Sequence, residues 1–404
     1  MSRTSTAPPT LHARTQEIDP PADLLDELGD DGFAWLDGGG GLVTAGMTAR
    51  LAPEDVTAAL ATADIDDPLV RPGTGAIAVG ALPFAGGGHL VVPRTVTAIA
   101  ADGTAWRTEI GPRAADKSRE QAARPAGPKQ FTVESIQSRD DWRRMIDTAL
   151  AEIDRGAVSK VVLAREVTVT ADAPFDPRAV LARLRATQAG SVAYGVLDDP
   201  VALLGATPEL LVRRQGSRVL SRPLAGTARR GSSDAHDDRA AAALASSVKD
   251  DREHRLVVDA VLDVLTPLCE DLRAEAPPTV IRLPSLRHLA TAVRGRLRSP
   301  APTALELAAA LHPTPALGGA PRAAALALLT RLEGFDRGRY AGPVGWVDAR
   351  GDGTFGVAIR GAEIDGARAR LRVGNGIVRG SVADDEWAET EPKLEPMLRV
   401  LVRP

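Results

Sequence analysis

Two short acidic patterns in this sequence could bind a hard cation. Asp250 and Glu253 are three residues apart, and Glu386 and Glu389 repeat that spacing. On a helix the spacing places both carboxylates on one face. Two such helices could surround an ion with oxygen ligands alone, which suits Mg²⁺ rather than zinc. The same spacing is common on solvated helix faces, so the pattern by itself leaves both interpretations open.

Two other residues have types that fit acid–base chemistry. Lys160 lies inside the apolar run Val158–Leu163, where its ammonium either reaches an edge or occupies a pocket. In a pocket, the loss of hydration favours the uncharged amine, which can act as a general base. Glu209 follows Thr207-Pro208 at the start of an expected strand. It is a candidate general acid, or else a solvated charge at the end of a strand.

The histidines and the single cysteine give little indication of a metal site or of a catalytic group. The six histidines are scattered, and His254, His288 and His312 lie in apolar surroundings typical of core histidines. Cys269 is the single cysteine, so the chain can form no internal disulfide and no cysteine-rich metal site. Nothing in the sequence marks a Ser-His-Asp triad.

The composition is that of an ordinary globular protein. The 404 residues are 44% hydrophobic and 25% charged, with a formal net charge of −4. There is no basic excess to drive binding to nucleic acid or to an anionic membrane. The sequence shows neither a secretory signal nor an apolar run near 18 residues. We therefore expect a cytoplasmic protein.

The elements that must position these residues can be outlined from pattern. We expect a disordered tail over residues 1–20, a β-rich segment over 21–112 with glycine turns, and a charged surface linker over 113–130. Residues 131–404 alternate helices and strands in mixed order. Antiparallel hairpins in that region predict an α+β fold rather than a doubly wound parallel one.

Several elements of the second half matter for the site. The β-branched run Val158–Thr170 predicts a strand, and residues 234–270 predict a helical region in two segments. Thr354–Ile364 predicts one strand, joined by the tight turn Asp365-Gly366 to the next. A helix is expected over Asp384–Val402.

Seven strings, taken in order, resemble the chorismate-utilising enzymes, which are the isochorismate, salicylate, anthranilate and aminodeoxychorismate synthases. The strings are Ser159–Arg165, Ala206–Leu210, Pro223–Thr227, Lys249–His254, Leu311–Gly319, Gly345-Trp346 and the closing pair Gly374–Val378 with Glu386–Lys393. Gly80–Phe84 resembles the N-terminal part of the isochorismate synthases more weakly. The resemblance implies one large α+β domain, with residues 131–404 forming the catalytic region around a Mg²⁺-dependent cleft for chorismate.

The resemblance also implies roles. Lys160 would be the base for water and Glu209 the acid for the departing hydroxyl. Glu253 and Glu389 would be direct Mg²⁺ ligands, with Asp250 and Glu386 completing the shell. The remaining substrate-binding residues would be Gly226, Thr227, His288, Ala316, Tyr340, Arg360, Gly376 and Lys393.

Three positions favour the isochorismate synthases within this group. Lys160 is typical of enzymes that add water, Ala225 replaces a lysine nucleophile of the aminodeoxychorismate synthases, and Ala316 is typical of enzymes that stop before pyruvate loss. A salicylate synthase is the nearest alternative, and a catalytically silent binding protein is a more distant one. No amidotransferase subunit is implied, and we expect a monomer. The downstream pathway, to a catechol siderophore, salicylate or menaquinone, stays open.

Two features depart from the family pattern. Pro392 and Pro396 lie inside the expected final helix, where a kink could displace Lys393 from Glu389. Asn375 stands where the family usually has alanine.

Overall fold

A long strand with apolar residues on both faces organises the molecule. In the computed structural model, which describes residues 11–111, 127–197 and 201–402, this strand is β9 (Lys160–Ala171). Val161 and Leu163 belong to one buried apolar cluster, and Val167 and Val169 belong to a second. The strand therefore runs through both halves of the core, as expected for an element that is buried on both sides.

The strands of the described residues pair almost entirely in antiparallel fashion, and twenty of them connect into one sheet system while β14, β16 and β17 form a second, smaller sheet. Those of the first half are β1 (His12–Ile18), β2 (Phe33–Asp37), β3 (Gly40–Leu51), β4 (Asp64–Asp66), β5 (Ile77–Ala81), β6 (Leu90–Ile99), β7 (Ala105–Gly111), β8 (Phe131–Ser135), β9, β10 (Val192–Val196) and β11 (Ala202–Thr207). Those of the second half are β12 (Leu210–Gln215), β13 (Arg218–Arg222), β14 (Leu224–Arg229), β15 (Cys269–Ala274), β16 (Thr279–Arg282), β17 (Leu286–Ala290), β18 (Val293–Leu297), β19 (Gly319–Ala320), β20 (Pro343–Asp348), β21 (Gly353–Val357), β22 (Gly361–Asp365) and β23 (Arg368–Ile377).

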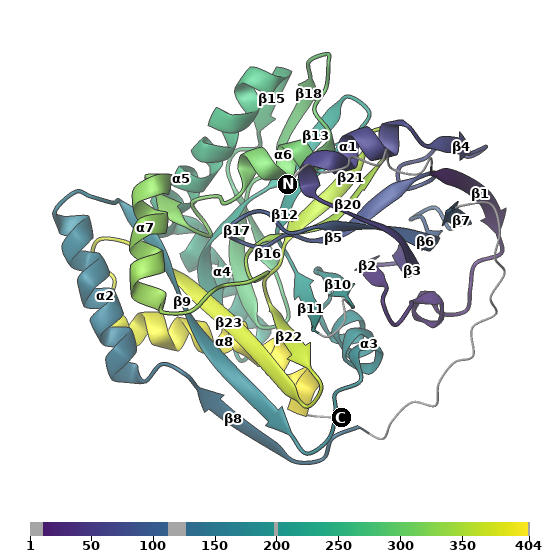
Figure 1. Ribbon diagram of the computed structural model, residues 1–404. Coiled ribbons are helices and arrows are strands. Elements are labelled where there is room, and N and C mark those ends of the chain that lie inside the picture. The colour runs from purple at the N-terminus through teal and green to yellow at the C-terminus, as the bar shows by residue number, and fades with distance from the viewer. Residues whose placement is uncertain (1–10, 112–126, 198–200, 403–404) are drawn as a thin grey trace, which may run out of the picture.

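Helices cover the outside of these sheets. They are α1 (Pro53–Ala61), α2 (Arg139–Asp154), α3 (Pro177–Thr187), α4 (Asp234–Ser246), α5 (Val248–Leu265), α6 (Ala304–Leu311), α7 (Arg322–Glu333) and α8 (Ala383–Val402), with short 3₁₀ turns at Leu24–Glu27 and Thr266–Leu268. Figure 1 shows the N-terminal strands on one side of the molecule and α2, α5 and α7 on the other. The α+β prediction is confirmed. None of the described helices is long and apolar enough to cross a membrane.

The N-terminal segment is part of the same domain. β2 pairs with β10, and β5 pairs with β20, so strands from both sides of residues 112–126 share one sheet. The prediction of a disordered tail over residues 1–20 is wrong for His12–Ile18, which form β1 along β7. This polar strand is ordered because alternate residues such as Ala13 and Thr15 turn inward. Residues 1–10 and most of the expected linker over 113–130 lie outside the described residues.

The single strand expected over Thr354–Ile364 is also wrong. It is divided into β21 and β22 because Arg360 adopts a left-handed backbone conformation with φ of 56°, which interrupts an extended chain. The break turns the Arg360 side chain toward the interior of the site.

The final helix is continuous through both prolines. Pro392 has no N–H to donate to the carbonyl of Ala388, and Arg229 of β14 donates to that oxygen instead, at 3.2 Å. The expected displacement of Lys393 from Glu389 does not occur, since the two side chains are bonded at 2.7 Å.

Candidate active site

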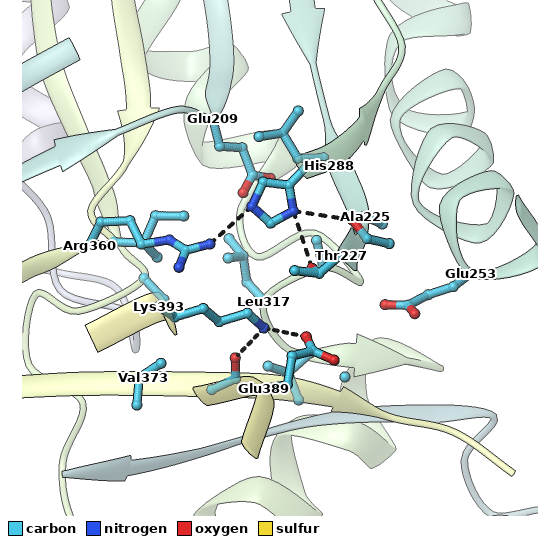
Figure 2. Close-up of a pocket in the computed structure, with 18 of the residues that line it drawn as sticks. Glu209, Ala225, Thr227, Glu253, His288, Leu317, Arg360, Val373, Glu389 and Lys393 are labelled. Carbon is cyan, nitrogen blue, oxygen red and sulfur yellow. Dashed lines mark hydrogen bonds and ion pairs between the residues drawn. The ribbon is translucent and has the colours of Figure 1, made fainter. Parts of the chain in front are cut away.

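One pocket gathers every residue that the sequence proposed for the site. It is lined by residues of β9, β14, β17, β23, α5 and α8 and of the loops that lead to them. The predicted residues that line it are Lys160, Glu209, Gly226, Thr227, Asp250, Glu253, His288, Ala316, Tyr340, Arg360, Gly376, Glu386, Glu389 and Lys393. Figure 2 shows the charged members pointing toward one another from different elements.

Lys160 occupies a pocket rather than an edge. The residue is 1% exposed, and its Nζ donates to Oε1 of Glu253 on α5 at 2.8 Å. Gly376 on the neighbouring strand leaves the room for this pair, because a Cβ there would lie 2.6 Å from Cε of Lys160. Burial opposes the charge of Glu253, but the charge and hydrogen bond of Lys160, together with the charges of Lys393 and Lys249, hold the pKa of Glu253 below its usual value.

Glu209 lies between β11 and β12 and is 6% exposed. Burial raises the pKa of Glu209 to about 7, although the charges of Lys160 and Arg360 act in the opposite direction. A carboxyl with a pKa near neutrality can hold a proton and release it during a reaction, which is what a general acid requires. The structure therefore favours this interpretation of Glu209 over a solvated strand-end charge.

His288 is a bonded polar residue of the pocket, not a core histidine. Its Nε2 lies 3.1 Å from Nη2 of Arg360, and its Nδ1 lies 3.1 Å from the carbonyl oxygen of Gly226. Arg360 can only donate, so Nε2 accepts its hydrogen bond. The ring proton must then be on Nδ1, which donates to the carbonyl oxygen of Gly226. Burial and the charges of Arg360 and Lys393 lower the pKa of His288 to about 3, so the ring stays neutral. Thr227 also contacts Nδ1, at 3.1 Å.

Arg360 has an unused donor. Its Nη1 is buried and has no hydrogen-bond partner, and Tyr340 lies in the same pocket wall. Burial lowers the pKa of Arg360 to about 10, against the opposing influence of Tyr340, Glu389 and Glu209, which leaves it charged near neutrality. A buried guanidinium with a free N–H is suited to a carboxylate, which it can bind through two hydrogen bonds.

Four carboxylates face the pocket from α5 and α8. Burial raises the pKa of Glu386, and the nearby charge of Glu389 adds to this effect. Within the described ranges, no three His, Cys, Asp or Glu side chains lie close enough together to share one ion. Glu253 and Glu389 are each bonded to a lysine instead. The donor set is nevertheless all oxygen, and a cation would offset the charge of Glu389 beside the buried Glu386, so its chemistry fits Mg²⁺.

The pocket also contains groups that the sequence did not single out. Only five lysines occur in the sequence, and Lys160, Lys249 and Lys393 all line this pocket. Arg337 lines it too, fully buried in an ion pair with Glu333. Lysine is rare here, since only five of the 49 Lys and Arg residues are lysines. That rarity could have drawn attention to Lys249. Arg337 and Glu333 look like an ordinary helix-end pair in sequence.

The chain matches the family model described as chorismate binding enzyme over residues 92–402, a range that contains the whole pocket. It belongs to the chorismate-binding enzyme family. The resemblance read from the seven strings is thereby confirmed.

Relatives of this chorismate-binding enzyme share most of its length. MenF of Mycobacterium tuberculosis, a provisionally named isochorismate synthase, is 43% identical over 387 residues, covering 91% of this chain and 95% of the relative. The isochorismate synthase DhbC of Bacillus subtilis is 38% identical and covers 80% of each chain. Among solved structures, MenF of Escherichia coli, a menaquinone-specific isochorismate synthase, superposes with a TM-score of 0.84 at 25% identity, covering 98% of this chain and 95% of the other.

Proposed function

We propose that this protein is an isochorismate synthase, an isomerase that adds water at C2 of chorismate and removes the hydroxyl at C4. The observation that carries the proposal is the joint placement of a buried lysine, a buried carboxyl with a pKa near 7 and a buried arginine with a free N–H in one pocket. The relatives that share this length of chain are named isochorismate synthases.

The residues divide the reaction into two proton transfers. Lys160, once it has lost the extra proton of its ammonium form, takes a proton from the attacking water, and its contact with Glu253 holds the nitrogen in place. Glu209 gives a proton to the C4 hydroxyl, which leaves as water while the ring double bonds shift. One water enters and one leaves, so the net change is an isomerisation, and no covalent enzyme intermediate is needed.

Chorismate carries two carboxylates, and the pocket offers a separate partner to each. Arg360, with Tyr340 beside it, would bind the enolpyruvyl carboxylate through its free Nη1. The ring carboxylate would lie near the backbone of Gly226, Thr227 and Gly376. Gly226 can serve because its φ of 74° and the nearness of Asp250 exclude a side chain there.

Glu253 and Glu389 would hold Mg²⁺, with Asp250 and Glu386 completing the shell. When bound, the ion would neutralise the ring carboxylate and draw electron density from the diene. Lys393 adds a positive charge beside Glu389 at the same wall. Since water and not ammonia is the nucleophile, we expect a monomer without an amidotransferase subunit. The product would serve menaquinone, catechol siderophore or salicylate synthesis.

Incubation of the purified protein with chorismate and Mg²⁺, with products separated by chromatography, tests the proposal. Isochorismate without pyruvate is expected. Salicylate with an equal amount of pyruvate would keep the site but assign the protein to salicylate synthesis. No turnover, together with no shift of the melting temperature by chorismate and Mg²⁺, would contradict an enzymatic role, because a bound ligand must stabilise the fold.

A further inference from the structure

A single asparagine lies directly behind the proposed metal site. Asn375 is the only asparagine in the 404-residue sequence. It is 2% exposed and belongs to β23. The glycines on either side of it, Gly374 and Gly376, line the pocket, whereas Asn375 is not among the lining residues. Any effect of this residue on the reaction must therefore pass through its neighbours.

Both ends of the Asn375 amide are used. Its Oδ1 accepts a hydrogen bond from Nζ of Lys393, and its Nδ2 donates to the backbone carbonyl of Glu386 at 2.5 Å. The two partners lie on α8, seven residues apart, and thus on the same helix face with Glu389 between them. The amide fastens this face to β23 at both ends.

The ammonium of Lys393 is divided among three acceptors. Besides Asn375 these are Oε1 of Glu389 at 2.7 Å and the carbonyl oxygen of Gly374 at 3.2 Å. An ammonium has three hydrogens, so each has a partner. Without the asparagine one hydrogen would lose its acceptor, and the charge would be shared between Glu389 and Gly374 alone.

The contact requires an amide. One acceptor faces a cation and one donor faces a carbonyl, and asparagine supplies both from a short side chain. Aspartate of the same size would keep the acceptor but would turn a second oxygen toward the Glu386 carbonyl. Alanine would supply neither group.

We propose that Asn375 is a positioning residue for the acidic face of α8, which keeps Glu386 and Glu389 arranged to bind a divalent cation. It does so by holding the first turn of the helix against β23 and by preventing Lys393 from neutralising Glu389 alone. This inference rests on the metal role given to these glutamates in the proposed function.

A first experiment needs neither chorismate nor metal. In protein labelled with ¹⁵N-lysine, the five ammonium groups can be observed by NMR where hydrogen bonds slow their exchange with water, and Lys393→Arg identifies the Lys393 signal. We expect a protected Lys393 signal that disappears in Asn375→Ala and persists in Asn375→Asp, which retains an acceptor. A signal unchanged in Asn375→Ala would overturn the contact on which the proposal depends.

A second experiment measures the cation itself. Calorimetric titration with Mg²⁺ alone should give a Kd about five- to tenfold higher for Asn375→Ala, the size expected for the net loss of one ordinary hydrogen bond. Asn375→Asp keeps the acceptor for Lys393 but replaces the tie to Glu386 with two facing oxygens, so its Kd should also exceed that of the unchanged protein. If Asn375→Ala does not fold, the Kd of Asn375→Asp tests the proposal in its place. A lower melting temperature with an unchanged Kd would show a merely structural role and overturn the proposal.

The two proposals fail differently. Normal chorismate turnover, with the Lys393 signal and the Mg²⁺ affinity of Asn375→Ala both unchanged, overturns the role of Asn375 alone. Absence of turnover in the unchanged protein, with both readouts moving as expected, overturns the proposed reaction alone. Turnover by a protein that binds no Mg²⁺ overturns the metal role in both.

Discussion

At the scale of single residues, the surroundings of Lys160 fix its side chain in one position. Its side chain is enclosed, and its Nζ is held by Glu253. The uncharged amine, which is the form that can act as a base, therefore has one position from which to reach a water molecule. Lys160→Gln keeps a donor for Glu253 but cannot take a proton. We expect isochorismate formation to fall by about 10² to 10⁴, the usual contribution of a positioned base.

The measurement is turnover by chromatography beside the melting temperature. Lys129→Gln, at an exposed lysine outside the pocket, is the matched control and should retain full activity. Full retention in Lys160→Gln as well would remove the lysine from the mechanism.

Glu209 predicts a pH dependence. Its pKa of about 7 in the free protein means that the proton needed by the leaving hydroxyl is present below pH 7 and is lost above it. The limb of kcat/KM governed by this group should therefore fall as the pH rises past 7. Glu209→Gln should have little activity and should lose this limb.

The same shift has a consequence for stability. The pKa of Glu209 rises on folding from its ordinary value of 4.5, so the folded protein binds more protons between about pH 4.5 and 7. The contribution of Glu209 to the free energy of unfolding must then decrease as the pH rises through that window. In Glu209→Gln this part of the pH dependence should be missing from urea unfolding curves. An unchanged dependence would place the pKa of Glu209 near its ordinary value.

At the scale of elements, the ion pair of Glu333 and Arg337 supplies hydrogen bonds to a stretch of β9 that no strand pairs with on that edge. One edge of β9 pairs with β19 at residues 160–161 and with β8 at residues 167–171. Between these two strands, Glu333 accepts from the backbone N–H of Ala164 at 2.7 Å, and Arg337 donates to the carbonyl of Val162 at 2.8 Å. Arg337 also donates to the carbonyl of Leu317 at 2.8 Å, which fixes the loop that carries Ala316.

Removing one member of this pair should be costly. Arg337→Met leaves the buried carboxylate of Glu333 without its counter-charge and two backbone carbonyls without this donor. We expect a loss of about 3 to 5 kcal/mol in the free energy of unfolding. Glu333→Leu combined with Arg337→Met removes the stranded charge and should recover part of the loss. Urea unfolding of the three proteins tests this. Equal stability of the single and double variants would mean that Glu333 finds another partner.

The sequence predicted the structure correctly where the residue types are compatible with only one environment. The β-branched run of β9 predicted a buried strand, and the family strings brought every candidate residue to one pocket. β1 escaped prediction because His12, Arg14 and Gln16 give it a polar composition, and only its pairing with β7 orders it. The break at Arg360 and the role of Arg337 depend on tertiary contacts, which no local spacing encodes.

At the scale of the whole molecule, the N-terminal segment supports the site without lining it. Phe84 accepts a hydrogen bond through its carbonyl from Nε2 of His312 at 3.0 Å, and its ring lies 4.5 Å from the guanidinium carbon of Arg337. Phe84 therefore packs behind the loop that carries Ala316. With the pairing of β2 to β10 and of β5 to β20, the segment is a structural part of the catalytic half.

This arrangement predicts that residues 127–404 cannot fold alone. Without β2 and β5, the central strands β10 and β20 would each expose an edge of unpaired backbone groups next to buried apolar side chains, a typical cause of aggregation. We expect this fragment to be insoluble or to lack a cooperative thermal transition. Co-expression of residues 1–111 and 127–404 as two chains is the matched control, because it restores both strand pairs, and it should recover a sharp transition and isochorismate formation. Cooperative unfolding and full turnover by residues 127–404 alone would instead show that the catalytic region is an independent domain, and that the N-terminal strands only add to its stability.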